Sequence, residues 1–344
     1  MSADKPKSKR PGRATIADVA AHAGVSISTV SRVLNGRPDV AEAKREAVLE
    51  AIRVHGFTSR RSPRGPSARG RLVAVMLPDV RSEYFAGMLA GVLEALRGLD
   101  MHAVFCPDQQ DSETFHERLL GRATNGAILL FPSSSPQTIA DLADHEYPFV
   151  VVDPRQPLPN GIASVTAANL AGARAVTSHL VELGHKRIAV VIGPQDLSSM
   201  SERLLGFRAA LASAGMLAPE ELVREGHLSI ETGYAAAQGL LDRPDRPTAI
   251  FAFNDRMAVG VLQAARERGL RVPYDISVAG FDDTELGQIA TPGLTTVRIP
   301  LEEMGRIAVT QLTRLLERQP VDSLQVELAT TLIVRGSTGP APAL

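Results

Sequence analysis

The segment TIADVAAHAGVSISTVSRVLNG, Thr15–Gly36, contains two short helix patterns separated by one glycine. Thr15 precedes an apolar run and Asp18 follows three residues later, which is the spacing of a capping box. Gly24 ends the run at a position where a left-handed residue closes a helix. Ser26 is suited to cap a second helix, and Asn35-Gly36 ends that helix. The segment therefore predicts two short helices joined by a tight turn.

Apolar residues at helical spacing give these helices, and a third one over about 41–54, a common core. The inward positions are Ile16, Val19, Ala20, Ala23, Val30, Val33, Leu34, Ala47, Val48, Ala51 and Ile52. This arrangement is typical of a helix-turn-helix unit, whose second helix enters the major groove of DNA. The outward positions of that helix are Ile27, Ser28, Thr29, Ser31, Arg32 and Asn35. Arg32 is suited to a bidentate contact with guanine, and a generic three-helix bundle with a solvated Arg32 is the alternative.

Charge is distributed unevenly along the 344 residues, although the formal net charge is only −1. Residues 1–71 contain 15 Lys and Arg against 6 Asp and Glu, whereas the remainder contains 22 against 32. A basic N-terminal part on an acidic body predicts that only the N-terminal part meets a polyanion such as DNA.

The chain beyond residue 71 alternates strand and helix signals. Continuous apolar runs at 72–77, 102–106, 126–131, 149–153, 187–193, 248–253 and 277–281 read as parallel strands covered on both faces. Seven or more such strands over this length predict an α/β body of two doubly wound parallel-sheet subdomains. The fold class is then an all-α helix-turn-helix headpiece plus this body, which resembles the two-lobed fold of periplasmic binding proteins.

Ligands of open parallel sheets bind at the carboxyl ends of the strands. The candidate effector-binding residues near such ends are Asp79, Tyr84, Phe85, Asp153, Arg203, Asn254 and Asp282. Several have polar groups that suit a ligand rich in hydroxyl groups, and Tyr84 and Phe85 offer a stacking face. Taken singly, Asn254 and Asp282 also read as helix caps, and Arg203 reads as a surface cation.

The Thr15–Gly36 segment resembles the DNA-binding headpiece of the lactose and galactose repressor (LacI/GalR) family. The resemblance implies that Ile27, Ser28 and Arg32 read bases and that Asn35 occupies the family's helix-end asparagine position. It also implies backbone phosphate contacts for Thr15, Ser26, Thr29 and Ser31.

The body resembles the effector domain of the same family through ND-x-MA-x-G at 254–260, P-x-D-x-S-V-x-G-F-D-D at 273–283 and P-x-L-T-T-V at 292–297. The resemblance implies that Asp153, Arg203, Asn254 and Asp282 bind a sugar or another effector. Ile299 and Leu130 stand where relatives often have polar residues, so we expect part of the pocket to be more apolar.

The predicted organisation follows from these patterns. A basic flexible tail (1–13) precedes the helix-turn-helix domain (14–57), the linker (58–71), the effector-binding and dimerisation domain (72–338) and a short tail (339–344). Within the effector domain we expect an N-subdomain of about 72–168 plus 299–327 and a C-subdomain of about 169–298 plus 328–338. Residues 84–99, with Met88, Leu89, Val92 and Leu96, are candidates for part of a homodimer interface, and the core of each monomer is the alternative place for these apolar side chains.

The linker departs from the pattern of the resembled family. That family usually has a hinge helix there, with a leucine that enters the minor groove. Here Pro63, Gly65 and Pro66 fall inside the corresponding stretch, so we predict no regular hinge helix across 62–67. Arg60, Arg61 and Arg64 are candidates for contacts to phosphates or to a narrow minor groove, and a solvated linker is the alternative.

The expected partners are double-stranded operator DNA, a small effector and a second copy of the chain. We expect a ligand-responsive repressor whose effector is a sugar or oligosaccharide, with a purine-type metabolite as the alternative and a solute-binding protein as a remote one. The sequence has no phosphate-loop motif, nucleophile elbow or His/Cys metal spacing, so we expect neither an enzyme nor a cofactor. A single cysteine, Cys106, and the lack of a secretory or membrane-spanning segment predict a cytoplasmic protein.

Overall fold

The computed structural model describes residues 15–34, 40–55, 71–78, 82–108, 119 and 124–342. These residues belong to two compact units, one within Met1–Arg69 and one within Gly70–Leu344. The predicted tail 1–13 and linker residues 58–70 lie outside the described residues. Arg71, which we assigned to the linker, is instead the first residue of a strand, because it pairs with Met101 of the neighbouring strand.

The N-terminal unit consists of α1 (Ile16–His22), α2 (Ile27–Leu34) and α3 (Glu42–His55). The predicted capping box is present, since the Asp18 amide donates to Thr15 Oγ1 and the Thr15 amide donates to Asp18 Oδ2. Val19, Val30, Val48 and Ala51 are completely buried between the three helices. This confirms the helix-turn-helix unit.

Gly24 sets the angle between the first two helices. Its φ of 64° lies in the left-handed region that favours glycine. The Val25 amide donates to the Ala20 carbonyl and the Gly24 amide to the Ala21 carbonyl, which is the Schellman closure of a helix. Two helix-end carbonyls are thereby satisfied, and α2 begins three residues after Gly24.

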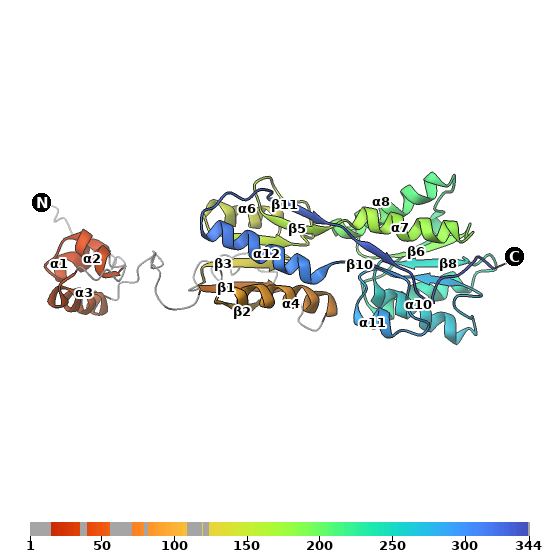
Figure 1. Ribbon diagram of the computed structural model, residues 1–344, viewed down its shortest axis with the longest axis horizontal. Coiled ribbons are helices and arrows are strands. Elements are labelled where there is room, and N and C mark those ends of the chain that lie inside the picture. The colour runs from red at the N-terminus through yellow and green to blue at the C-terminus, as the bar shows by residue number, and fades with distance from the viewer. Residues whose placement is uncertain are drawn as a thin grey trace, which may run out of the picture. The chain divides into compact units, whose positions relative to one another are not determined.

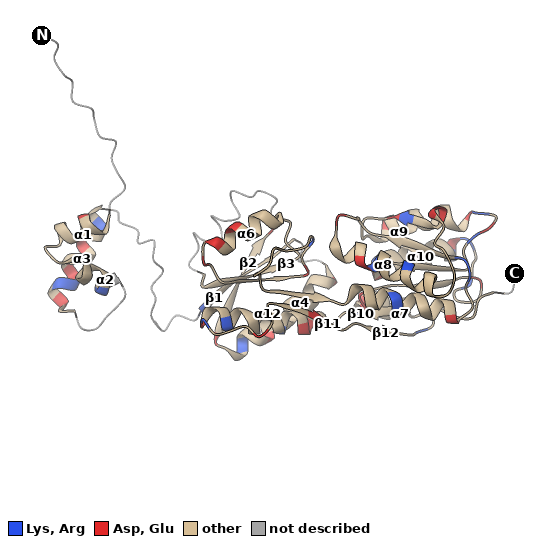
Figure 2. Ribbon diagram, turned by 90° about the horizontal axis from the view of Figure 1, so that it is seen from above, with Lys and Arg blue, Asp and Glu red and all other residues tan. Residues whose placement is uncertain are grey.

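The larger sheet of the second unit is built from six strands in the order β11-β5-β4-β3-β1-β2, and all of its neighbouring pairs are parallel. The strands are β1 (Arg71–Leu77), β2 (Met101–Pro107), β3 (Gly126–Leu130), β4 (Phe149–Val152), β5 (Ser164–Ala167) and β11 (Gln325–Leu328). Helices α4 (Glu83–Gly98) and α12 (Leu301–Leu316) cover one face, and α6 (Pro136–Asp144) covers the other (Figure 2). Successive side chains of β1 point to opposite faces of the sheet. Val73 and Val75 therefore pack in one hydrophobic core, and Ala74 and Met76 pack in the other.

The smaller sheet has four parallel strands in the order β7-β6-β8-β9. They are β6 (Ile188–Ile192), β7 (Val223–Glu225), β8 (Ala249–Ala252) and β9 (Ser277–Ala279). The helices of this lobe are α7 (Asn169–Glu182), α8 (Ser198–Ser213), α9 (Ile230–Leu241), α10 (Asp255–Glu267) and α11 (Glu285–Ile289), with a 3-10 turn at Glu220–Leu222. Phe207, Phe251, Phe253 and Phe281 are completely buried in its core.

The chain passes between the two lobes three times: after β5, after β10 (Thr296–Arg298) and after β11 (Figure 1). β10 pairs antiparallel with β12 (Thr331–Ile333), which follows the third crossing. Two α/β lobes joined in this way confirm the predicted fold class.

Glycines allow close packing of helices within each lobe. A Cβ at Gly91 of α4 would overlap the Glu302 backbone of α12, and one at Gly305 would overlap the Met88 backbone. Gly233 and Gly260 stand in the same relation between α9 and α10. Because packed interiors tolerate little added volume, these positions fix the distances between paired helices.

Beyond the seven strands with continuous apolar runs the structure contains β5, β7, β10, β11 and β12, which are only three or four residues long. Two expectations about this unit need correction. Met88, Val92 and Leu96 are core residues with at most 1% exposure, so they cannot supply an interface. Residues 339–341 are not a free tail, because the Gly339 amide donates to Ser277 Oγ and the Ala341 amide donates to the Leu183 carbonyl.

Candidate functional site

Helix α2 presents a polar outer face that begins with a hydroxyl cluster. The Thr29 amide donates to Ser26 Oγ at 3.1 Å, which confirms Ser26 as the cap. Ser26 Oγ also lies 2.7 Å from Ser28 Oγ and 2.8 Å from Thr29 Oγ1. Ile27 is 52% exposed, and Arg32 is exposed one turn further on. An exposed apolar side chain beside short hydroxyls and an arginine matches what a groove-reading helix requires.

The structure describes only some of the other predicted DNA-contacting residues. The Thr15 hydroxyl donates to Asp18 Oδ2 at 2.8 Å, so Thr15 stabilises the start of α1. Ser31 is half-buried on α2. Asn35, Arg60, Arg61 and Arg64 lie outside the described residues.

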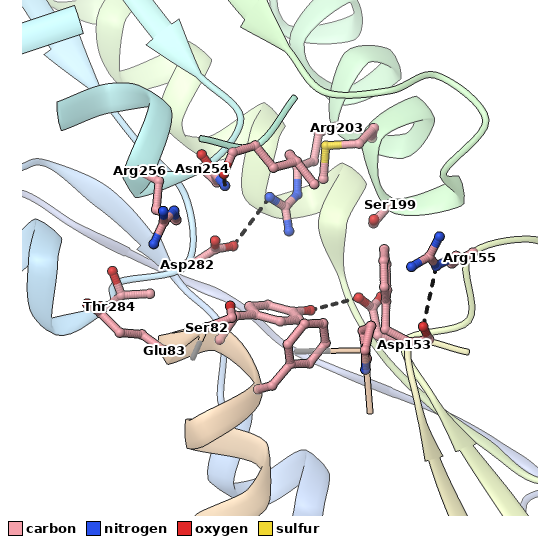
Figure 3. A pocket seen from close by; sticks show the side chains of 16 residues that line it. Ser82, Glu83, Asp153, Arg155, Ser199, Arg203, Asn254, Arg256, Asp282 and Thr284 are labelled. Carbon is pink, nitrogen blue, oxygen red and sulfur yellow. Dashed lines mark hydrogen bonds and ion pairs between the residues drawn. The ribbon is translucent and has the colours of Figure 1, made fainter. Parts of the chain in front are cut away.

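A cavity of about 610 Å³ opens between the two lobes of the second unit (Figure 3). Its size is typical of small-molecule sites in proteins. Six of the seven predicted effector-binding residues line it, and the seventh, Asp79, lies outside the described residues. The six are Tyr84, Phe85, Asp153, Arg203, Asn254 and Asp282. The carboxyl ends of the strands therefore bring these side chains together across some 200 residues of sequence.

Arg203 of α8 is the most enclosed of them, with 2% of its surface exposed. Its Nε donates to Asn169 Oδ1 at 2.9 Å, and its Nη1 donates to the Phe253 carbonyl. The guanidinium carbon lies 3.7 Å from the centre of the Phe281 ring. The alternative of a surface cation is therefore wrong: Arg203 is a fixed donor in the cavity wall.

Asp282 completes a buried ion pair, since its Oδ1 lies 3.3 Å from Arg203 Nη1. This contact is an ion pair but does not meet the geometry of a hydrogen bond. Asp282 Oδ1 therefore has no hydrogen-bond partner among the described residues. Burial raises the pKa of Asp282, and the neighbouring Arg203 opposes that rise. Asp282 does not cap a helix, because the residue before α11 is Thr284.

Asp153 lies on the opposite lobe and accepts a 2.8 Å hydrogen bond from the Tyr84 hydroxyl. Burial raises the pKa of the Asp153 carboxyl, and the hydrogen bond from Tyr84 partly offsets this. Tyr84 packs edge-on against Phe85, whose ring is 6.0 Å from that of Phe131. One wall of the cavity thus combines aromatic faces with a buried acceptor.

Asn254 has two functions. Its Oδ1 accepts from the Met257 amide at 2.8 Å, so it does cap α10. Its Nδ2 donates to the Leu228 carbonyl at 3.3 Å, and the residue still lines the cavity. Capping and ligand contact are therefore compatible at this position.

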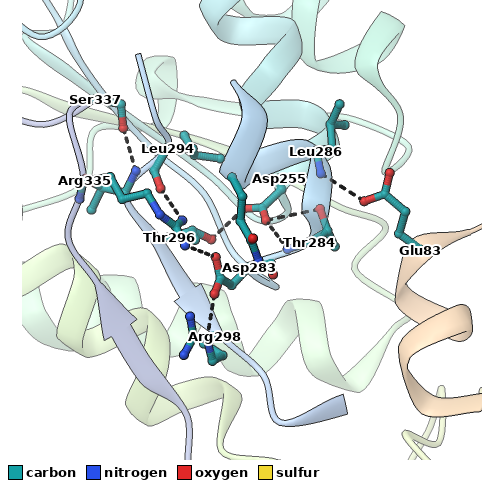
Figure 4. Close-up of polar contacts among 12 residues, drawn as sticks. Glu83, Asp255, Asp283, Thr284, Leu286, Leu294, Thr296, Arg298, Arg335 and Ser337 are labelled. Carbon is teal, nitrogen blue, oxygen red and sulfur yellow. Dashed lines mark hydrogen bonds and ion pairs between the residues drawn. The ribbon is translucent and has the colours of Figure 1, made fainter. Parts of the chain in front are cut away.

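A buried polar network that the sequence did not predict holds the loop that contains Asp282 (Figure 4). The Asp283 carboxyl accepts two hydrogen bonds of 2.6 Å. One comes from Nε of Arg298, the last residue of β10, and the other from Nη2 of Arg335, just beyond β12. Asp255 accepts from the Thr284 amide at 2.8 Å and from Thr296 Oγ1 at 2.6 Å. These contacts fix the loop against the segments that cross between the lobes.

Within this network the pKa of Asp255 is raised to about 7, because its carboxyl is removed from water and hydrogen bonds recover only part of the lost solvation. Gly280 and Gly287 leave room for this carboxyl, since a Cβ at either position would overlap its oxygens. From the other lobe, Glu83 Oε2 accepts from the Leu286 amide at 3.2 Å.

The sequence also missed part of the cavity lining. Ser82, Glu83, Phe131, Arg155, Ser199, Met200, Leu228, Arg256 and Thr284 contribute to it. Arg155 lies three residues beyond the end of β4, and Ser199 lies seven residues beyond the end of β6. Both would have been predicted if more residues after each strand had been considered. Leu130 and Ile299 are buried outside this lining, so our reason for expecting a more apolar pocket was wrong.

His185 is a structural residue, in agreement with its place after a helix-ending glycine. Its ring nitrogens lie 2.9 Å from Thr248 Oγ1 and 3.0 Å from both Ser277 Oγ and the Gly339 carbonyl. Burial lowers its pKa.

The described residues include no group of three or more His, Cys, Asp or Glu side chains that could hold a metal ion. None of the helices in the described part is long and apolar enough to span a membrane.

Comparisons with known proteins agree with this architecture. Residues 15–59 match the family of bacterial regulatory proteins, lacI family, and residues 177–338 match the periplasmic binding protein-like domain. The HTH-type transcriptional regulator CelR of Thermobifida fusca is 35% identical over 96% of this chain and 99% of its own length.

Two solved structures are similar along nearly the whole chain. The transcriptional regulator CelR–cellobiose complex has a TM-score of 0.71 at 34% identity and covers 94% of this chain and 100% of its own. The lac repressor dimer bound to operator and an anti-inducer has a TM-score of 0.72 at 29% identity and covers 95% and 100%. Together with the helix-turn-helix unit and the cavity between two lobes, these likenesses show that the chain is a DNA-binding transcriptional regulator and belongs to the LacI family.

Proposed function

We propose that the protein is a repressor whose affinity for operator DNA is controlled by a small molecule bound in the cavity between the lobes. The observation that supports this most directly is the cavity itself. Residues from both lobes line it, and Asp282 is tied through Asp283 to Arg298 and Arg335 on the crossing segments. A ligand that favours one relative orientation of the lobes would shift the equilibrium between two states of the regulator.

We infer that the effector is a sugar or oligosaccharide. Arg203, Asn254 and Asp282 offer donors and acceptors for hydroxyl groups, and Tyr84 and Phe85 offer aromatic faces. The similar regulator CelR has been solved with cellobiose. A purine-type metabolite in the same cavity remains the second candidate, because the same aromatic rings could stack on a base.

On the DNA side, we infer that Ile27, Ser28 and Arg32 read bases. We assign phosphate contacts to Thr15, Ser26, Thr29 and Ser31, with Asn35 at the helix end and Arg60, Arg61 and Arg64 as linker contacts. We propose that two copies bind a near-palindromic operator as a homodimer, in the cytoplasm, where the DNA lies. A binding protein rather than an enzyme fits relatives that are regulators.

Gel-shift titration against the DNA upstream of its own gene tests the repressor proposal. We expect a sequence-specific complex with a steep salt dependence. Arg32→Ala should weaken operator binding by about 1–3 kcal/mol and relax base preference at one position in each half-site. Equal binding to every duplex would contradict the proposal, and a uniform loss in Arg32→Ala would limit that residue to phosphate contact.

The linker contacts can be tested separately. Replacing Arg60, Arg61 and Arg64 together by serine should make the slope of log affinity against log salt shallower if they contact phosphates. An unchanged slope would favour a solvated linker.

A thermal-shift screen tests the effector class, because a ligand of the native state raises its stability. Neutral sugars, acidic sugars and purines form its three arms. A sugar that stabilises the effector domain and also changes the affinity of the full chain for its operator would support the proposal. Stabilisation by purines alone would replace the sugar by the second candidate.

A further inference from the structure

The carboxyl groups and the arginines that line the cavity differ in how many of them have a partner of opposite charge or a hydrogen-bond partner. All three carboxyl groups in the described lining have a partner: Glu83 accepts from the Leu286 amide, Asp153 from the Tyr84 hydroxyl, and Asp282 lies beside Arg203. Of the three arginines in that lining, only Arg203 is paired with a carboxyl group of a described residue. Arg155 and Arg256 therefore bring positive charge to the cavity that no described carboxyl group pairs with.

Of these two arginines, Arg256 belongs to α10, whereas Arg155 lies beside the N-terminus of the 16-residue helix α8. The half-buried Arg155 lies against this end of the helix, because its carbonyl accepts a 2.7 Å hydrogen bond from the Ser198 amide. Arg155 Nε is 3.4 Å from the Phe131 carbonyl, and the guanidinium lies 4.6 Å from the centre of the Phe131 ring. These contacts orient the guanidinium without neutralising its charge.

Ser199, in the first turn of α8, provides the second observation. Its side chain is only 5% exposed and lines the cavity, yet neither its hydroxyl nor its amide has a hydrogen-bond partner among the described residues. Figure 3 shows the hydroxyl directed into the cavity, on the same side of it as Arg155. Because Ser199 lines the cavity, its hydroxyl remains available to a ligand or to water there.

We propose that Arg155, Ser199 and the N-terminus of α8 form an anion subsite, and that the effector carries a carboxylate or phosphate group. A planar guanidinium binds such oxygens in a bidentate manner, and the amides and dipole of a helix N-terminus favour negative charge. Because the inference rests on the proposed function, the effector class becomes an acidic sugar, either a sugar acid or a sugar phosphate.

The rest of the cavity is compatible with an anion. Asp153 is directed to Tyr84 and Asp282 to Arg203, so neither carboxyl group faces the subsite as an unpaired charge. Burial also raises the pKa of Asp282 to about 8, which reduces the negative charge that an incoming anion would meet. The neutral part of the ligand retains Arg203, Asn254 and the aromatic wall.

The test measures binding to the full chain by calorimetry and thermal shift. The ligands are hexoses and cellobiose as neutral sugars, the corresponding uronates and 6-phosphates, and inorganic phosphate alone. We expect one acidic form to bind about tenfold or more tightly than its neutral parent, and Arg155→Gln to remove that advantage. Carboxylate and phosphate arms then distinguish the two sources of charge.

Inorganic phosphate makes the test independent of the sugar. It should stabilise the wild-type chain more than Arg155→Gln or Ser199→Ala, whereas its general salting effect is common to all variants. Arg208→Gln, which removes an exposed arginine from the same helix outside the cavity, should behave like the wild type. Circular dichroism and thermal unfolding without ligand verify that all three variants are folded.

Two results would overturn the anion subsite: equal stabilisation of wild type and Arg155→Gln by phosphate, or a neutral sugar that binds at least as tightly as its acidic forms. If phosphate acts through Arg155 but no sugar binds, the subsite stands and the sugar effector falls. If a neutral sugar binds at least as tightly as its acidic forms and controls operator affinity, the proposed function stands and the anion subsite falls.

Discussion

Two arginines in one cavity are held in opposite ways. Arg203 is 2% exposed and contacts Asn169, Phe253, Phe281 and Asp282, so its charge and most of its donors are already used inside the protein. Arg155, on the other lobe, has one long hydrogen bond and one ring contact, and it has no carboxyl partner among the described residues. The same residue type therefore builds the wall at one end of the cavity and offers charge to a ligand at the other.

The difference teaches how stability and recognition separate within one site. Removing one member of a buried ion pair leaves the other charge without compensation, and this is strongly destabilising. A partly exposed cation that lacks a partner contributes little to folding. We therefore expect substitutions at the Arg203 end to change stability and those at the Arg155 end to change ligand affinity.

The largest effect should come from Arg203→Met, which keeps the length of the side chain but removes its charge. Asn169 Oδ1 and the Phe253 carbonyl would lose a donor and Asp282 would lose its ion-pair partner, so the free energy of unfolding should fall by about 3–5 kcal/mol. Denaturation of the effector domain measures this, with Arg208→Met on the exposed face of α8 as the control. A loss below about 1 kcal/mol would remove the contrast with Arg155. Adding Asp282→Asn should restore part of the loss if the two charges are coupled.

The second effect concerns pH and the buried Asp255, whose pKa is raised to about 7. Because the native state holds this proton more tightly than the unfolded chain, the stability it contributes is present below about pH 4 and is lost as pH rises through 7. Asp255→Asn mimics the protonated acid and removes this dependence. The stability of the variant relative to wild type should therefore rise by roughly 4 kcal/mol between pH 4 and pH 8. A constant difference across this range would show that Asp255 stays ionised.

The smallest effect on stability should come from Arg155→Gln and Ser199→Ala. Each should change the free energy of unfolding by less than about 0.5 kcal/mol, because Arg155 is poorly satisfied in the folded state and Ser199 gives up no hydrogen bond. Thermal unfolding without ligand at pH 7 measures this. A large loss in either variant would mean that this end of the cavity is also part of the fold, and the comparison would no longer hold.

Much of the local structure was predictable from the sequence. Thr15 with Asp18, Gly24 and Ser26 predicted the boundaries of α1 and α2, because caps and left-handed closures depend on neighbouring residues. Long apolar runs predicted the central strands. The short strands were missed: β11 has the sequence QVEL and is half exposed, so it has no continuous apolar signal. It becomes a strand only because it pairs with β5.

The sequence by itself determined the helix-turn-helix unit, the two α/β lobes and the strand ends from which the cavity side chains extend. Only the tertiary structure decided which of those side chains are already satisfied. Arg203 meets a carbonyl 50 residues away, Asp283 meets an arginine 52 residues away, and Arg155 meets no carboxyl group in the described part of the chain. Caps and periodicity act over a few residues, whereas ion pairing and desolvation depend on which distant segments the fold brings together.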